Sequence, residues 1–147
     1  MRIVTTIQIR CPIDQVFDFL TTPAYWVRWH PSTLAVSGAT DHSLEVGEQV
    51  TEEYVVAGQP GRATWTVRER QAPFRWVFET TAENGHQATI SYTLKTAGDD
   101  THFEREVVIV FPAEIPEAAQ LAFQQKVEAE SAEALRRVKE VLEISPT

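Results

Sequence analysis

The chain has 147 residues, of which 43% are hydrophobic, and it carries a formal net charge of −8 with a pI near 5.0. This length suits a single domain, residues 1–147, with a substantial core. The acidic charge argues against nucleic acid or an anionic membrane surface as a partner, because binding to either needs a basic patch. No stretch is long and apolar enough to predict integral membrane association. The single cysteine, Cys11, and the absence of a signal-peptide pattern favour a cytoplasmic location.

The first part of the chain alternates between strand and short helix. Residues 3–9 alternate with a period of two, which predicts a β-strand. Pro12 stops this strand and suits the first turn of a short amphipathic helix that ends before Pro23. Residues 24–31 are too aromatic for an ordinary solvent loop, so we expect a second short helix or turn with its rings pointing inward. Residues 33–37 predict a brief strand.

Five strand-like segments follow from residue 49 onward, and one long helix closes the chain. Turn signals separate the strands at 58–61, 71–73, 83–85 and 98–99, as in an antiparallel meander. Residues 115–144 have the 3.6-residue periodicity of an amphipathic helix, with Pro116 suited to its first position. This order of elements predicts the α+β class.

The apolar face of the predicted long helix is uneven. It carries Ala119, Phe123, Val127, Ala134, Val138 and Val141, with Leu135 and Leu142 at its edge. The polar residues on or near the same face are Gln120, Gln124, Glu130 and Ser131. A helix that only filled a core would be expected to carry more large side chains there. Two interpretations stay open: a helix that leaves a gap for a ligand, or a core helix that tolerates a few polar residues at its edge.

The turns also predict which residues are neighbours across the sheet, since a shift of one residue would turn every side chain over. On one face we expect three rows: Val50, Glu69, Trp76, Tyr92 and Arg105; Glu52, Val67, Phe78, Ile90 and Val107; and Tyr54, Trp65, Thr80, Ala88 and Ile109. The opposite face collects mainly Thr, Glu, Arg and Lys. One aromatic face and one wet face are typical of an antiparallel sheet that is covered on one side.

Three ionisable residues, Glu52, Glu69 and Arg105, interrupt the aromatic face. A buried charge without a partner is costly, so each should pair, reach water or contact a ligand. They are either solvated at the rim of the sheet or part of an apolar cavity with a few polar groups, the usual form of a small-molecule site.

His30, in an aromatic setting, is either an acid/base or a capping histidine. The spacing of the His and Cys residues predicts no metal site.

Several segments resemble a known family. Residues 11–20, with Pro12, Val16 and Phe17, are similar to that family's Pro-x-x-x-Val-[Trp/Phe] first helix. Residues 29–31 (Trp-His-Pro) match the aromatic turn that follows this helix in the family. Residues 44–48, which contain Gly47, match the segment with a glycine before the long hairpins. Residues 101–105 resemble the strand that enters the final hairpin. The family is the START-related (SRPBCC) superfamily, in its polyketide cyclase/dehydrase and lipid-transport branch. The resemblance covers nearly the whole chain.

This resemblance implies a helix-grip fold, in which a curved antiparallel sheet of about six to seven strands wraps around a long C-terminal helix, with two short helices after the first strand. It also implies a deep pocket for lipids, polyketides or other apolar molecules, and no tightly bound cofactor. Our first hypothesis is therefore binding of a hydrophobic small molecule, as carrier or sensor, with Arg105 anchoring a carboxylate, phenolate or carbonyl. The predicted ligand-binding residues are Trp26, Trp29, His30, Glu52, Tyr54, Trp65, Glu69, Trp76, Phe78, Ile90, Tyr92, Arg105, Val107, Gln120, Phe123 and Val127.

Two alternatives stay open. An enzyme of the polyketide cyclase/dehydrase type would hold a flexible polyketone and use one acid/base, with Arg105, Tyr92, His30 and Glu52 as catalytic candidates. A co-chaperone-like interaction module would instead have a filled core and an exposed apolar patch. The sequence names neither the ligand nor the oligomeric state, and a homodimer stays open.

Overall fold

A computed structural model of the protein describes residues 1–83 and 85–144. Within them, seven strands form one antiparallel sheet in the order β1-β7-β6-β5-β4-β3-β2, which confirms the predicted α+β helix-grip architecture. The elements are β1 (Arg2–Ile9), α1 (Ile13–Thr21), the 3-10 turn η1 (Pro23–Tyr25), α2 (Trp26–Trp29), β2 (Thr33–Gly38), β3 (Gln49–Val56), β4 (Gln59–Gln71), β5 (Arg75–Thr81), β6 (Gln87–Ala97), β7 (Asp100–Val110) and α3 (Glu117–Ile144).

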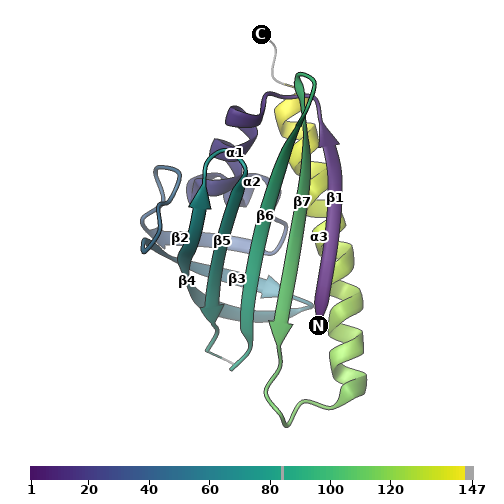
Figure 1. Ribbon diagram of the computed structural model, residues 1–147. Coiled ribbons are helices and arrows are strands. Elements are labelled where there is room, and N and C mark those ends of the chain that lie inside the picture. The colour runs from purple at the N-terminus through teal and green to yellow at the C-terminus, as the bar shows by residue number, and fades with distance from the viewer. Residues whose placement is uncertain (84, 145–147) are drawn as a thin grey trace.

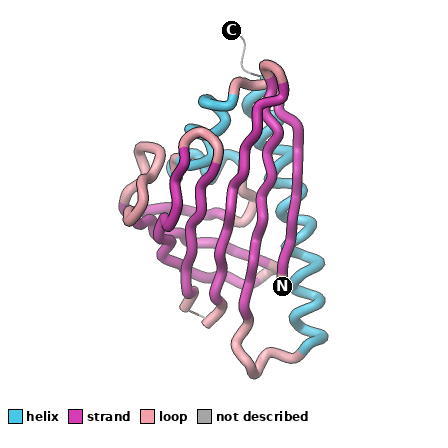
Figure 2. The backbone as a smooth tube through the Cα atoms, viewed as in Figure 1, coloured by secondary structure: helices cyan, strands magenta, loops and turns pink. Residues whose placement is uncertain are grey.

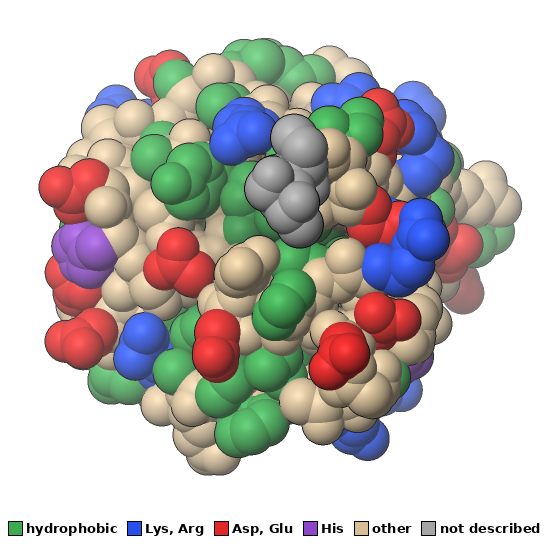
Figure 3. Space-filling view, turned by 90° about the horizontal axis from the view of Figure 1, so that it is seen from above, with side chains coloured by type: hydrophobic (Ala, Val, Ile, Leu, Met, Phe, Trp, Pro, Cys, Tyr) green, Lys and Arg blue, Asp and Glu red, His purple; other side chains and the backbone are tan. Residues whose placement is uncertain are grey.

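The sheet curls around one side of α3. Figure 1 shows β2 and β3 crossing behind the longer strands, while α3 runs beside β1. The two short helices cover one end of the sheet, and the connection from β7 to α3 lies at the other end (Figure 2). On the face seen from above, acidic and basic side chains lie scattered between apolar ones (Figure 3). No helix in the described part of the chain is long and apolar enough to cross a membrane.

The first helix forms as its sequence predicts. Pro12 immediately precedes α1, and the helix buries Val16, Phe17 and Leu20. Its last residue, Thr21, also donates its hydroxyl to the carbonyl of Phe17 at 2.7 Å, within the last turn of the helix. The result is a short, well-anchored element that fixes where α2 begins.

The predicted pairing of the last three strands is confirmed. Trp76 faces Tyr92 and Tyr92 faces Arg105, and the next inner row aligns Phe78, Ile90 and Val107. The two-residue loop predicted at 98–99 also joins β6 to β7. Of the turn predicted at 83–85, residue 84 lies outside the described residues, and β6 begins at Gln87.

The predicted pairing between β3 and β4 was wrong by four residues. Val50 faces Trp65 and not Glu69, and Tyr54 faces Gly61 and not Trp65. The cause is the turn, which starts earlier than predicted because Ala57 adopts a left-handed conformation, with φ of 52°, before Gly58. Since side chains alternate with a period of two, a shift of four leaves every residue on its predicted face.

A second difference lies between β4 and β5. An irregularity between Val67 and Glu69 places Glu69 opposite Val77, not opposite Trp76 as predicted. Glu69 consequently joins the outer face, where its carboxylate forms an ion pair with Arg75 at 3.0 Å. The sequence pattern predicted the correct face for the first part of β4 but not beyond this irregularity.

The long helix is confirmed with a shorter N-terminal end. It begins at Glu117 and not at Ile115, and Pro116 lies just before it. The helix buries Val127, Ser131, Ala134, Leu135 and Val138. Ala119, which we predicted on the buried face, is exposed, because the first turns of α3 extend past the packed part of the sheet.

Candidate functional site

A cavity of about 130 Å³ lies between the inner face of the sheet, α2 and the first half of α3. It is lined by Trp26, Trp29, His30, Thr33, Glu52, Tyr54, Val56, Gln59, Ala63, Trp65, Phe78, Thr80, Ala82, His86, Ala88, Ile90, Tyr92, Arg105, Val107, Ile109, Phe123, Val127, Glu130 and Ser131. Small residues explain the empty space: Ala63, Thr80 and Ala88 occupy inner positions on three adjacent strands, where larger side chains would fill it.

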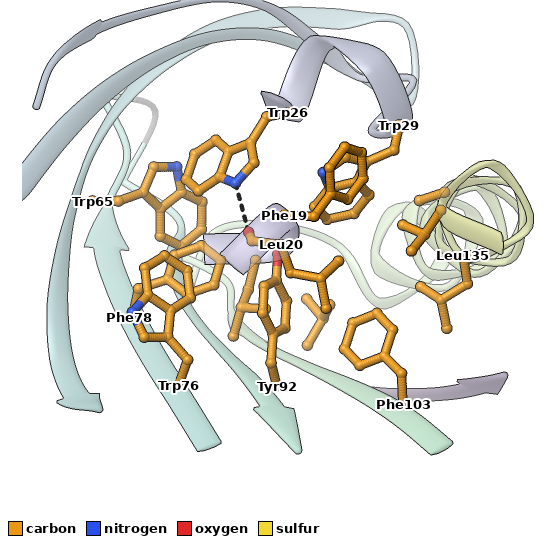
Figure 4. Packing of buried hydrophobic residues seen from close by; sticks show 14 of the residues in the cluster. Phe19, Leu20, Trp26, Trp29, Trp65, Trp76, Phe78, Tyr92, Phe103 and Leu135 are labelled. Carbon is orange, nitrogen blue, oxygen red and sulfur yellow. Dashed lines mark hydrogen bonds between the residues drawn. The ribbon is translucent and has the colours of Figure 1, made fainter. Parts of the chain in front are cut away.

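Aromatic rings form most of the wall. Figure 4 shows Trp26 and Trp29 on α2 facing Trp65, Phe78 and Tyr92 on the sheet. Trp26 is fixed by a hydrogen bond of 3.0 Å from its indole N–H to the carbonyl of Leu20, and its ring stacks on Phe78 with centroids 5.7 Å apart. These rings are held in place by their neighbours, so the cavity presents a rigid apolar surface.

A chain of hydrogen bonds crosses the polar end of the cavity. The Arg105 guanidinium donates through Nη1 to the Ser131 hydroxyl at 2.9 Å and through Nη2 to Nε2 of His30 at 3.1 Å. His30 Nδ1 lies 3.1 Å from the Thr33 hydroxyl, which donates to the Glu52 carboxylate. The chain links a cationic group to an acidic one through two neutral side chains.

The direction of these bonds assigns the His30 tautomer. Arg105 has only N–H donors, so Nε2 of His30 must accept and Nδ1 must carry the hydrogen. Burial, then the positive charges of Arg105 and Arg137, hold the pKa of His30 well below its usual 6.5. His30 is therefore a neutral imidazole near pH 7, held in a single orientation.

The two acidic groups near Arg105 also have shifted pKa values. Burial raises the pKa of Glu52 above 4.5, although hydrogen bonds from Thr33 and Trp65 oppose that rise. Burial also raises the pKa of Tyr92 to about 12, against the opposing effect of the Arg105 guanidinium. The Tyr92 phenol is therefore protonated at neutral pH.

Next to this polar end, Glu130 on α3 contacts the segment before β2 and the β3–β4 turn. The Glu130 carboxylate accepts hydrogen bonds from the Ser32 hydroxyl at 2.7 Å and from the Ala57 backbone N–H at 3.1 Å. Beside this turn, the Tyr54 ring lies directly over Gly61, where an added Cβ would come within 2.5 Å of the ring. Glycine at this position is what allows the tyrosine to lie flat across the neighbouring strand.

Most of the predicted ligand-binding residues come together in this lining, and the exceptions are Glu69, Trp76 and Gln120. Glu69 lies on the outer face, as described above. Trp76 is fully buried and donates its indole N–H to the Leu44 carbonyl at 3.0 Å. Gln120 donates to the Ile115 carbonyl at 3.0 Å, beside the start of α3.

The four catalytic candidates, Arg105, Tyr92, His30 and Glu52, also line the cavity. Sequence reasoning did not identify Thr33 as the residue that joins His30 to Glu52, because a threonine in a short edge strand carries no distinctive signal. Ser131 was identified as a polar residue near the buried helix face, but not as the partner of Arg105. Within the described residues, no group of three or more His, Cys, Asp or Glu side chains could hold a metal ion.

Comparisons with known proteins agree with this architecture. The family model described as polyketide cyclase/dehydrase and lipid transport matches residues 1–143. A search of curated proteins found no significant match. Membership of this family implies binding of hydrophobic ligands in general.

Several solved structures share the fold at low sequence identity. A conserved protein from Geobacillus kaustophilus superposes with a TM-score of 0.78 at 10% identity, covering 97% of this chain and 95% of that one. A START superfamily protein from Mycobacterium smegmatis gives 0.77 at 12% identity, covering 96% and 98%. DynU16, described as a putative protein in the dynemicin biosynthetic locus, gives 0.70 at 15% identity, and the match covers 97% of this chain but 47% of DynU16. These similarities show the fold alone.

Proposed function

We propose that this chain, which belongs to the polyketide cyclase/dehydrase and lipid transport family, binds a hydrophobic small molecule in the cavity between the sheet and α3, as a carrier or sensor. The observation that carries the proposal is the unfilled space itself. Residues 1–83 and 85–144 leave a cavity walled by buried rings, and apolar walls with a few polar groups are typical of ligand sites.

Three of the four tryptophans, Trp26, Trp29 and Trp65, line the cavity, so tryptophan fluorescence should report a bound ligand. The experiment is a titration with fatty acids, sterols and aromatic polyketides. We expect saturable quenching or a spectral shift with at least one class. The absence of any saturable change across the panel would count against ligand binding.

A matched pair of variants separates cavity binding from surface binding. Ala88→Phe places a phenyl group in the cavity, whereas Thr89→Phe adds the same group one residue along β6, on the outer face. We expect the first variant to weaken binding at least tenfold and the second to leave it unchanged. Equal affinity in both variants would mean that the ligand binds elsewhere.

A second candidate function is catalysis of the cyclase/dehydrase type, and the neutral, oriented His30 favours it. A neutral imidazole can accept a proton, and in His30 the accepting atom is Nε2, which must first release its hydrogen bond from Arg105. Turnover of a polyketone substrate that is lost in His30→Gln and retained in His102→Gln, a change on the outer face, would support this role. The co-chaperone alternative expected a filled core, and the cavity gives it no support.

A further inference from the structure

The charge of Arg105 is unbalanced at close range. Its side chain is only 4% exposed, yet among the described residues it forms no ion pair with a carboxylate. Its hydrogen bonds go to the neutral acceptors Ser131 and His30, and it also interacts with the Tyr92 hydroxyl, which is neutral as well. Burying a guanidinium without a counter-charge costs free energy. A negatively charged group of a ligand in the cavity would therefore be stabilised beside Arg105.

Glu52 does not form a direct ion pair that would balance the charge of Arg105. His30 and Thr33 lie between it and Arg105, and both of its carboxylate oxygens are already occupied by Thr33 and Trp65. Burial raises the pKa of Glu52 and so disfavours its charged form, although the hydrogen bonds and the Arg105 guanidinium act in the opposite direction. The other carboxylate in the lining, Glu130, precedes Ser131 in α3, and its oxygens accept hydrogen bonds from Ser32 and Ala57.

Hydrogen-bond donors also exceed acceptors at this end. Arg105 Nε and Trp29 Nε1 are buried donors without a hydrogen-bond partner in the described structure. The acceptors near them, Glu52 and His30, are already used. Buried polar groups are normally paired, so these two unpaired donors show that this end of the structure is short of hydrogen-bond acceptors.

The remainder of the wall sets the shape of the occupant. Trp26, Trp65, Phe78 and Tyr92 present ring faces and edges, and the cavity volume of about 130 Å³ suits a compact molecule better than a long acyl chain. We propose that the cavity selects a planar aromatic anion, whose carboxylate or phenolate oxygen pairs with Arg105 while its ring lies among the tryptophans. This inference rests on the proposed ligand-binding function and names the class of ligand.

Calorimetric titration of the intact chain with naphthoate and with naphthamide tests the charge. The two probes share the ring and nearly the same shape, and they differ by one negative charge. We expect naphthoate to bind at least tenfold more tightly to the wild type, a difference of about 1.4 kcal/mol. Equal affinities, or binding of neither probe, would overturn the anion proposal. The wider proposal of an apolar ligand would then depend on the fluorescence panel alone.

A pair of arginine variants assigns the preference to one residue. In Arg105→Met the preference for naphthoate over naphthamide should fall below about threefold, because the charged partner is gone while an apolar side chain keeps the wall closed. In Arg75→Met, a change on the outer face, the preference should be retained. A preference that survives in Arg105→Met would assign the anion to another group. If that variant does not fold, the comparison of the two probes on the wild type still decides the charge preference.

A third probe tests whether the cavity accepts a phenolate as well as a carboxylate. The absorbance spectrum of para-nitrophenol differs between phenol and phenolate, so the bound form can be identified directly. Binding as phenolate would include phenolates in the class, and binding of naphthoate alone would restrict it to carboxylates. Binding of para-nitrophenol as the neutral phenol, together with equal binding of naphthoate and naphthamide, would contradict the proposal.

Discussion

The two halves of α3 meet the same sheet in different ways. The second half, residues 131–144, buries Ala134, Leu135 and Val138 and is also tied to β1, where Lys139 Nζ donates to the Gln8 carbonyl at 2.9 Å. The first half, residues 117–130, buries only Val127, and the cavity lies beneath it. One helix therefore both closes a core and covers a cavity, because its large apolar side chains gather in one half.

Paired leucine truncations should show this difference most strongly. Leu135 is 1% exposed and Leu121 is 57% exposed, so the same Leu→Ala change samples the two halves of one helix. We expect Leu135→Ala to lower the free energy of unfolding by about 2–5 kcal/mol and Leu121→Ala to change it by less than about 0.5 kcal/mol. Urea unfolding measures both. Similar losses would mean that the first half is packed as firmly as the second.

Replacing an alanine by phenylalanine in the packed core and in the cavity wall should give the next largest contrast. Ala134 lies in the second half of α3 and is fully buried, so Ala134→Phe should cost about 1–3 kcal/mol or more through overpacking. Ala88 faces the cavity, and Ala88→Phe should be tolerated with a loss below about 1 kcal/mol. Thermal and urea unfolding provide the measurement, and an equal loss in the two variants would argue that the cavity is not free space.

The pH dependence of stability should come mainly from the cavity end. Because the pKa of His30 is lowered in the folded state, its contribution is present above 6.5 and is lost as the pH falls below that value. We expect wild type to lose more stability than His30→Gln between pH 7 and 5, by about 1.4 kcal/mol for each unit of pKa shift. Glu52, with a raised pKa, acts in the opposite sense, so the variant is needed to isolate the histidine.

The control for this experiment is His102→Gln, which changes a histidine on the outer face of β7. Its unfolding free energy should follow wild type across the same pH range. If His30→Gln and wild type lose stability in parallel, the buried, neutral state assigned to His30 would be wrong.

The smallest expected effect is at the junction of the two halves. Glu130→Gln keeps the side-chain length but removes the charge that strengthens the hydrogen bonds from Ser32 and Ala57. We expect a loss of about 0.5–1.5 kcal/mol in unfolding free energy. Glu128→Gln, at an exposed position two residues away, is the control and should be neutral. No difference between them would show that Glu130 does not hold the turn.

The fold was predictable because its signals are local. Alternation along the strands, Pro12 before α1 and the short loop at 98–99 each depend on neighbouring residues, and together they specify the architecture. The turn at Ala57 was missed because an alanine with positive φ is uncommon, whereas Gly58 and Gly61 suggested a later turn. The irregularity after Val67 was missed for a similar reason, since no glycine marks it.

The sequence predicted which side chains lie on the inner face of the sheet, but it did not predict the hydrogen bonds between them. An error of four residues between β3 and β4 kept Glu52 and Tyr54 on the inner face, so they were still assigned to the lining. The partners of the polar groups could not be predicted, because pairing Arg105 with Ser131 and His30 depends on how far α3 and α2 lie above the sheet. That distance is a property of the packed molecule and not of any one segment.

The Ala57 backbone N–H donates to a carboxylate that lies 73 residues further along the chain. Its protection from deuterium exchange therefore depends on α3 being docked, and not on the strand ladder that protects other amides of the hairpin. This single amide can thus report the separation of α3 from the β3–β4 turn, and slower deuteration at Ala57 upon addition of a compound would identify ligands that stabilise this contact.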